Sequence, residues 1–176
     1  VSMGGDRITI GHGSGGRLTR DLVRDVFLPA LDDPRLAELG DAARLAAVDG
    51  DLALTTDGFV VSPRVFPGGD VGCLAVYGTV NDLAVAGAVP IALTASFVLE
   101  EGLAVAELAA VAASMGAAAR RSGVAVVAGD TKVVERGHGD GVFVVTAGVG
   151  RMRPDAPPGA RAIRPGDEVV ASGPIG

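Results

Sequence analysis

Apolar residues recur at helical spacing near the start of the chain. Over 17–31 they lie three and four positions apart, as on one face of an amphipathic helix: Leu18, Leu22, Val23, Val26 and Phe27. The same reasoning predicts a helix over 68–88, which opens with glycines, and an alanine-rich helix over 105–121. The last of these ends in "RRSG", with basic residues in its last turn and a glycine just beyond it, as helix C-termini favour.

Short apolar runs between these helices predict β-strands. They cover 91–99, 124–128 leading into "GDTK", and 142–149. The stretch "ARLAAVDGDLALTTDGFVV" predicts strand, turn and strand, because Asp49-Gly50 is a strong two-residue hairpin signal. Helices and strands alternate, yet this hairpin forces some antiparallel pairing. The expected class is therefore mixed α/β or α+β, with a mixed sheet flanked by helices.

The end of the chain has a different composition. A proline- and glycine-rich connector, "RPDAPPGARAIRPGDE", follows the last predicted strand, and "EVVASGPIG" then predicts the start of a new strand. We therefore expect a first domain over 1–153. Residues 154–176 are expected to be a linker and the first strand of a second, truncated domain.

Composition and charge narrow the class of protein. The 176 residues are 48% hydrophobic and only 3% aromatic, so the core must be built from Ala, Val, Leu and Ile. The net charge of −6 argues against a general nucleic-acid surface, which needs clustered Lys and Arg. Cys73 is the single cysteine, so no intrachain disulfide can form and a reduced, cytoplasmic setting is expected. The apolar run 71–99 is interrupted by Asp82 and Pro90, which argues against a membrane span, and no signal peptide is visible.

The glycine-rich stretch "GHGSGGR", residues 11–17, can be interpreted in four ways. Its glycines fit G-x-G-x-x-G, but no acidic residue ends a second strand at the distance that a dinucleotide site needs. A phosphate loop of the G-x-x-x-x-G-K-[ST] type would need Lys and Ser or Thr where Arg17 and Leu18 stand. The stretch is otherwise a flexible entry to the helix, or a loop whose backbone N–H groups and Arg17 close over phosphates.

Four aspartates lie in apolar surroundings: Asp41, Asp57, Asp82 and Asp130. A carboxylate in such surroundings needs a partner, and no Lys or Arg occurs between Val65 and Arg120. Mg²⁺ binds carboxylates together with substrate phosphates, so these residues suit a magnesium–ATP site. The polar neighbours that could join it are Thr56, Asn81, Thr131 and Lys132. Simpler roles stay open, with Asp57 and Asp130 as turn formers and Asp82 as a buried residue bonded to the backbone.

Two other polar residues have structural explanations. Asp70, in "PGGDVG", is expected to cap the helix predicted over 68–88. Cys73 lies in the apolar part of that helix and is expected to be in the core.

Several stretches resemble one protein family in their residues and in their order along the chain: "GHGSGGR", "TTDGFVVSPRVFPGGDVG", "GTVNDLAVAGAVP", "FVLEEGL" and "GDTKVVERG". They resemble the hydrogenase expression/formation protein HypE. That family is part of the superfamily of aminoimidazole ribonucleotide synthetase, selenophosphate synthetase and thiamine-monophosphate kinase. The resemblance spans roughly residues 8–176, and "FPGGD" and "GDTKVVE" point to HypE more narrowly than to the superfamily.

The resemblance implies a PurM-like N-terminal domain. Sheets from two protomers would form a barrel-like homodimer, with ATP and Mg²⁺ in a groove there. The implied activity is the ATP-dependent dehydration of a carbamoyl group on the thiol of a C-terminal cysteine. The product is a thiocyanate, the source of the cyanide ligands of [NiFe]-hydrogenase. Implied partners are the carbamoyltransferase HypF and the HypC–HypD complex.

The implied C-terminal domain and its cysteine are absent from these 176 residues. Cys73 cannot replace that cysteine, because it lies in a helical region rather than on a mobile tail. The chain is therefore expected to be the ATP-binding half and, alone, an incomplete enzyme. Two alternatives stay open. One is a sister kinase or synthetase that acts on a free small molecule, and the other is a non-catalytic dimerisation or scaffold domain.

The resemblance also implies roles for individual residues. It places four carboxylates near Mg²⁺ and phosphates: Asp41, Asp57, Asp82 and Asp130. Lys132, in "GDTK", is implied to lie near the phosphate or the reacting group, and Lys132 and Asp82 are the expected catalytic residues. A mobile segment near ATP is implied for Gly13, Ser14, Gly15, Gly16 and Arg17.

Overall fold

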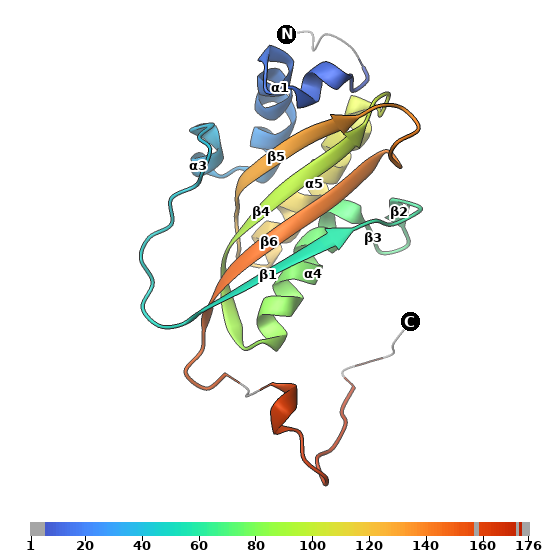
Figure 1. Cartoon of the computed structure of the whole chain (residues 1–176). Helices are drawn as coiled ribbons and strands as arrows, with labels where there is room; N and C mark the ends of the chain where they lie inside the picture. Colours follow the sequence, from blue (N-terminus) through green and yellow to red (C-terminus); the bar gives the residue numbers. More distant parts are fainter. Residues whose placement is uncertain (1–5, 157–158, 172, 174–176) are drawn as a thin grey trace.

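The computed structural model describes residues 6–156, 159–171 and 173. A four-stranded sheet with helices behind it forms the body of the molecule (Figure 1). In chain order the elements are the 3-10 helix η1 (Ile10–Gly13), α1 (Arg17–Leu22), the π-helical turn η2 (Val23–Phe27), α2 (Leu28–Leu31), α3 (Pro34–Ala37), β1 (Leu52–Phe59), β2 (Val65–Phe66), β3 (Gly69–Asp70), α4 (Val71–Val85), β4 (Ala88–Glu100), α5 (Val105–Arg121), β5 (Val126–Val134), β6 (Val142–Met152) and the 3-10 helix η3 (Ala160–Ala162). Among the described helices, none combines the length and the apolar character needed to cross a bilayer.

The sheet is mixed, with the strand order β1-β6-β4-β5. β6 lies between β1 and β4 and is antiparallel to both, whereas β4 and β5 are parallel. The parallel pair is connected through α5, since parallel strands need a long crossover. β2 and β3 form a separate small hairpin. The expected class, an α+β fold with a mixed sheet flanked by helices, is confirmed.

The helices pack on one face of the sheet, with α4 and α5 behind it in Figure 1. Two glycines allow unusually close approach of the helices. A Cβ at Gly72 in α4 would lie 2.2 Å from the backbone oxygen of Val111 in α5. A Cβ at Gly116 in α5 would lie 1.9 Å from the backbone oxygen of Ala30 in α2. The N-terminal helices are therefore held against α5, backbone to backbone.

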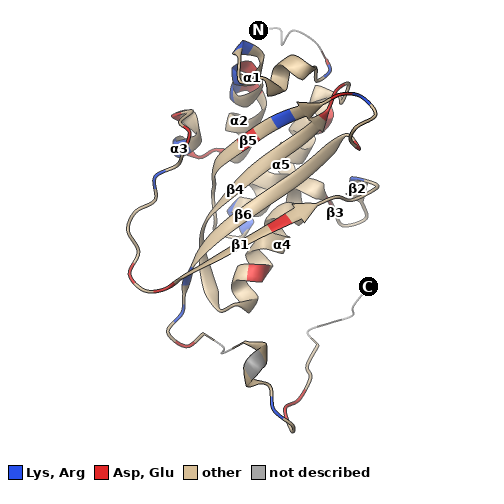
Figure 2. Cartoon of the chain, in the orientation of Figure 1, with Lys and Arg blue, Asp and Glu red and all other residues tan. Residues whose placement is uncertain are grey.

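The opposite face of the sheet, called the open face below, is covered by no helix among the described residues. Strand side chains alternate between the two faces, so the register assigns Leu54 of β1 and Val149 of β6 to the same face. On this face Leu54 is 80% exposed and Val145 is 42% exposed. Charged residues of β4 and β6 lie only near the strand ends, and Figure 2 shows the middle of the sheet as uncharged. The open face is thus a largely apolar surface, which among the described residues is bordered only by the segment 41–45.

The predicted helices are present, with adjusted bounds. The helix predicted over 105–121 coincides with α5, and that over 17–31 is continuous through α1, η2 and α2. The helix predicted over 68–88 begins later, at Val71, because Asp70 caps it. The carboxylate of Asp70 accepts a hydrogen bond from the backbone N–H of Cys73 at 3.0 Å, and Cys73 is buried, as expected.

Two predicted strands are wrong. The chain bends at Asp49-Gly50, with Gly50 at φ 95°, but residues 43–48 form no strand. Turn residues set a local bend, whereas a strand also needs an edge to pair with, and within the described chain β1 pairs only with β6. The strand predicted in "EVVASGPIG" is absent over 168–171, where Val169 and Val170 are exposed and have no sheet to join. Residues 172 and 174–176 lie outside the described residues.

Candidate functional site

The edge strand β5 carries an exposed ion pair. Asp130 and Lys132 are two positions apart and project from the open face. Lys132 Nζ lies 2.8 Å from Asp130 Oδ1, and the backbone N–H of Thr131 donates to the same oxygen at 2.8 Å. The hydrogen bond from Lys132 is the main cause that holds the pKa of Asp130 below its usual range. Both side chains are more than half exposed, so a ligand can reach the pair.

The glycine-rich loop packs against the same strand. A Cβ at Gly13 would lie 2.4 Å from the backbone nitrogen of Val133, so only glycine fits there. The backbone N–H of Gly15 donates to Thr19 Oγ1 at 3.0 Å, which ties the loop to α1. Beyond Gly13 the loop is exposed, and the Arg17 side chain is 91% exposed. The structure therefore places the predicted loop residues beside the ion pair of β5, anchored at Gly13. The mobility of the loop stays a prediction.

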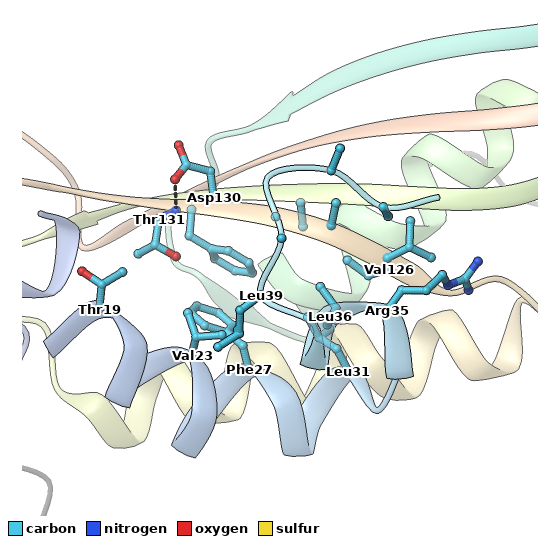
Figure 3. Close-up of a pocket in the computed structure, with 18 residues that line it drawn as sticks. Thr19, Val23, Phe27, Leu31, Arg35, Leu36, Leu39, Val126, Asp130 and Thr131 are labelled. Carbon is cyan, nitrogen blue, oxygen red and sulfur yellow. Dashed lines mark hydrogen bonds between the residues drawn. The ribbon is translucent and has the colours of Figure 1, made fainter. Parts of the chain in front are cut away.

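A pocket of about 200 Å³ lies next to this loop (Figure 3). The N-terminal helices and α3 form one wall, and β4 and β5 form the other. Two polar side chains, Thr19 and Thr131, lie at one end of the pocket, and the carboxylate of Asp130 points to the other side of β5 (Figure 3). Thr19 also accepts the bond from Gly15, so the polar end of the pocket adjoins the glycine loop.

A second group of predicted residues lies on β1 and α4. Thr55 Oγ1 donates to Asp82 Oδ2 at 3.0 Å, which joins the strand to the helix. Asp57 shares a face with Thr55, and a Cβ at Gly78, one turn before Asp82, would lie 3.6 Å from Asp57 Oδ2. Two carboxylates and a hydroxyl therefore line one strip along α4, with Asn81 exposed beside them. Such oxygen donors fit Mg²⁺, which takes one or two carboxylates and completes its shell with phosphate and water.

The single chain does not bring all the predicted residues together. In the strand register, Asp57 pairs with Thr146 of β6, Thr146 pairs with Ala95 of β4, and Ala95 pairs with Gly129 of β5. The two groups are thus three strand spacings apart, about 14 Å. In the part of the chain that the structure describes, no three metal-ligating side chains cluster. Asp41 is exposed on the segment after α3 and borders a hollow on the open face.

The predicted site is therefore divided into two half-sites. The β5 half-site consists of residues 13–17, Asp130, Thr131 and Lys132. The β1 half-site consists of Thr55, Asp57, Asn81 and Asp82. Because Asp41 belongs to neither, the expected cluster of four aspartates is not formed within one chain.

Sequence reasoning selected Thr56 and not its neighbour Thr55, which bonds Asp82; a role for Thr56 in the site stays a prediction. Thr56 projects from the face opposite to Asp57, and its hydroxyl donates to the backbone oxygen of Thr146 at 3.0 Å. Period-two alternation would have selected Thr55, because residues 55 and 57 share a face. Thr19 was not selected either, and no local signal identifies it, since its place beside the glycine loop depends on how α1 packs beside β5.

Comparisons with known proteins agree with this architecture. Residues 39–152 match the family described as AIR synthase related protein, N-terminal domain. The chain is 49% identical to the carbamoyl dehydratase HypE of Rhizobium leguminosarum bv. viciae, over 100% of this chain and 50% of that relative. Among solved structures, it is similar to HypE in complex with ATP, with 52% identity and a TM-score of 0.84 over 88% of this chain and 46% of that chain. It is also similar to a chain of a HypE–HypF complex, with 46% identity and a TM-score of 0.60 over 80% of this chain and 44% of that one.

These findings confirm the resemblance to HypE and the expected PurM-like fold. The chain spans about half the length of the curated relatives that it matches. The matched residues cover β1, α4, β4, α5, β5 and β6, which carry the whole β1 half-site and the strand of the β5 half-site, but not the glycine loop. The chain therefore belongs to the AIR synthase related family, through the N-terminal domain of that family.

Proposed function

We propose that this chain is the ATP-binding half of a HypE-type carbamoyl dehydratase that serves [NiFe]-hydrogenase maturation. The observation that carries the proposal is the similarity to HypE in complex with ATP, at 52% identity and a TM-score of 0.84. Catalysis is assigned to a longer protein. In it, residues 1–153 form the nucleotide-binding domain, and 154–176 form the linker and the start of a second domain.

The proposed reaction converts a carboxamide into a nitrile. The amide oxygen of an S-carbamoyl cysteine attacks the γ-phosphorus of ATP, the bond to the bridging oxygen breaks, and ADP leaves. The carbon–oxygen bond then breaks, phosphate leaves with that oxygen, and the nitrogen gives up its two protons. The products are a thiocyanate, ADP and phosphate. Phosphorylation is needed because an amide oxygen is otherwise a poor leaving group, and the protein must hold the two reactants in line.

Each half-site has a role in this reaction. Lys132 presents a mobile positive charge to the transferred phosphate, once it leaves the 2.8 Å contact with Asp130. Asp82, oriented by Thr55, accepts a proton from the amide nitrogen. Backbone N–H groups of the glycine loop and Arg17 bind the phosphate oxygens. The aspartates would hold Mg²⁺, which supplies charge screening for the phosphates when it is bound.

A homodimer would complete the site. The β1 and β5 half-sites lie at opposite edges of one sheet. In a symmetric dimer the β1 edge of each protomer can face the β5 edge of its partner, which gives two complete sites. The open face supplies an apolar surface for such an interface, with Leu54 80% exposed. Two open faces packed together would give the expected barrel-like assembly, with ATP in a groove at its rim.

Partners and compartment follow from the same assignment. A HypE–HypF complex is known for a similar chain, so HypF is the proposed donor of the carbamoyl group. The HypC–HypD complex is the proposed acceptor of the cyanide. The proposed compartment is the cytoplasm, because the single cysteine, Cys73, is a buried thiol.

The proposal is tested on the full-length protein with a carbamoylated C-terminal cysteine. Intact mass spectrometry after addition of Mg-ATP should show the loss of one water from the modified protein. Lys132→Gln should slow this loss about a hundredfold or more, as expected for a group that stabilises transferring phosphate. Arg44→Gln, on the exposed segment before β1, is the matched control and should not slow it. ATP binding without any loss of water would contradict the proposed reaction.

A further inference from the structure

Two buried threonines lie between α4 and the sheet and have no part in the chemistry described above. They are Thr79 of α4 and Thr146 of β6, and both side chains are buried. Their hydroxyl groups form a hydrogen bond with each other, and the hydroxyl of Thr146 also donates to the backbone oxygen of Ala75 at 3.4 Å. We propose that this pair positions the β1 half-site by fixing where α4 lies on the sheet. The inference rests on the proposed function and adds two residues that act through Asp82.

The first of two rows of α4 residues that meet the sheet lies on β6. It consists of Ala75, Thr79 and Leu83, which are spaced by four positions and therefore stack on one side of the helix. A Cβ at Gly148 in β6 would lie 2.7 Å from Thr79 Cγ2 and 3.1 Å from Leu83 Cδ1. The row therefore packs directly on the backbone of β6.

The second row lies on β1 and belongs to the β1 half-site. It consists of Gly78, beside Asp57, and Asp82, which accepts the bond from Thr55. Residues that pair directly across two strands project from the same face, so Asp57 and its partner Thr146 both face α4. Figure 1 shows α4 behind β1 and β6. The two rows are neighbours on one helix, so a shift of the row on β6 also moves Asp82 relative to Asp57.

Apolar packing alone does not fix the position of α4. Hydrophobic burial has no preferred direction, whereas a hydrogen bond weakens steeply away from its preferred distance and angle. Within the described residues, the hydrogen bonds that join α4 to the four-stranded sheet come from these two rows. The bond between Thr55 and Asp82 is exposed, so water and substrate can compete for it, whereas the threonine pair is buried. The buried pair is therefore the fixed point, and Asp82 lies only three residues beyond Thr79, about 4.5 Å along the helix axis.

The test separates the position of α4 from the stability of the fold. Thr79→Val removes one hydroxyl at almost unchanged volume, and Thr79→Ser is the matched control that keeps it. The double variant Thr79→Val/Thr146→Val removes both hydroxyls and leaves neither unpartnered, a replacement that can be nearly neutral for stability. Each variant of the full-length protein is compared by urea unfolding, by calorimetry with Mg-ATP, and by water loss from the carbamoylated cysteine. Asp82→Asn is measured alone and combined with the double variant.

We expect the double variant to unfold at the same urea concentration as the wild type and yet to lose water about tenfold more slowly, or more. Misplacement by about 1 Å can cost about a hundredfold in rate. Its affinity for Mg-ATP should fall by the same factor as in Asp82→Asn. Thr79→Ser should restore most of the rate that Thr79→Val loses. Combined with Asp82→Asn, the double variant should cause no further loss in either measurement, because the threonine pair acts through Asp82.

Three results would contradict the inference. A double variant that is as stable and as fast as the wild type would overturn it and leave the proposed function intact. Losses that add to those of Asp82→Asn would also overturn it, since the pair would then act elsewhere. If Asp82→Asn itself matches the wild type in rate and affinity, the inference and the role assigned to Asp82 both fail. Should the double variant unfold at lower urea, Thr79→Ser decides, because it must be faster than Thr79→Val although it lacks a buried methyl group.

Discussion

The contact between α5 and α2 makes Gly116→Ala the most informative stability variant. A Cβ at Gly116 would lie 1.9 Å from the backbone oxygen of Ala30, whereas ordinary contacts begin at 3.4 Å, so the two helices must part by 1.5 Å. Neither atom is at the end of a flexible side chain, and the same oxygen accepts a hydrogen bond from Arg120 at 3.2 Å. Overpacking costs about 3 kcal/mol at the upper end of its usual range. Alanine recovers about 1 kcal/mol of helix propensity, so the net loss is about 2 kcal/mol.

Thermal unfolding measures this loss. For a chain of this length, 2 kcal/mol lowers Tm by roughly 4–8 °C. Gly58→Ala in β1 is the control, because a Cβ there meets no atom within 4 Å, and its Tm should stay unchanged. The N-terminal helices carry the glycine loop, so ATP affinity should fall with Tm in Gly116→Ala. An unchanged or higher Tm would refute the backbone-to-backbone packing of α5 on α2.

Three further predictions concern the capping residue and the β5 half-site. Asp70→Ala should destabilise the chain by about 1 kcal/mol in urea unfolding, because α4 loses its cap, whereas Asp70→Asn should retain most of it; equal losses would contradict capping. Lys132→Gln should raise the carboxyl pKa of Asp130 in an NMR titration, since the bond from Lys132 is the main cause of its lowered pKa. A carboxylate with a lowered folded-state pKa contributes stability above the unfolded-state pKa and loses it as pH falls through the folded-state pKa. Because the pair is exposed, Lys132→Gln should cost only a few tenths of a kcal/mol at pH 7, and nothing once the carboxyl group is protonated in the folded state as well. Lys132 is the only lysine in these 176 residues, so peptide mapping of the full-length protein after amine labelling isolates it, and Mg-ATP should protect it; labelling that ATP leaves unchanged would place the phosphates elsewhere.

Much of the fold could be predicted because its signals are local. The spacing of apolar residues predicted both ends of α5 correctly and predicted the N-terminal helix as one continuous stretch. The segment "PGGDVG" identified the cap of α4. The prediction of a hairpin at Asp49-Gly50 was wrong because strand pairing is not a local property. A turn residue reports only the bend at its own position, whereas the strand before it depends on a free sheet edge that the sequence does not describe.

The candidate site was predictable as a set of residues but not as an arrangement. Asp57, Asp82 and Asp130 stood out because carboxylates are costly in apolar segments. Their separation depends on strand order. β1 and β5 became opposite edges of the sheet because β6, late in the sequence, is inserted beside β1. Pairing between strands that are far apart in the sequence has no local sequence signal, so only the structure shows that the site is divided into two half-sites.

In the proposed homodimer, each ATP site takes its β1 half-site from one protomer and its β5 half-site from the other. Asp82→Asn inactivates the first half-site and Lys132→Gln inactivates the second. Water loss from the carbamoylated full-length protein is measured for each variant and for an equal mixture after subunit exchange. Random pairing makes half of the dimers mixed, and each mixed dimer has one intact site of its two, so we expect about a quarter of the wild-type rate to return. A mixture no more active than the separate variants would contradict it, because sites built within one chain would all remain defective.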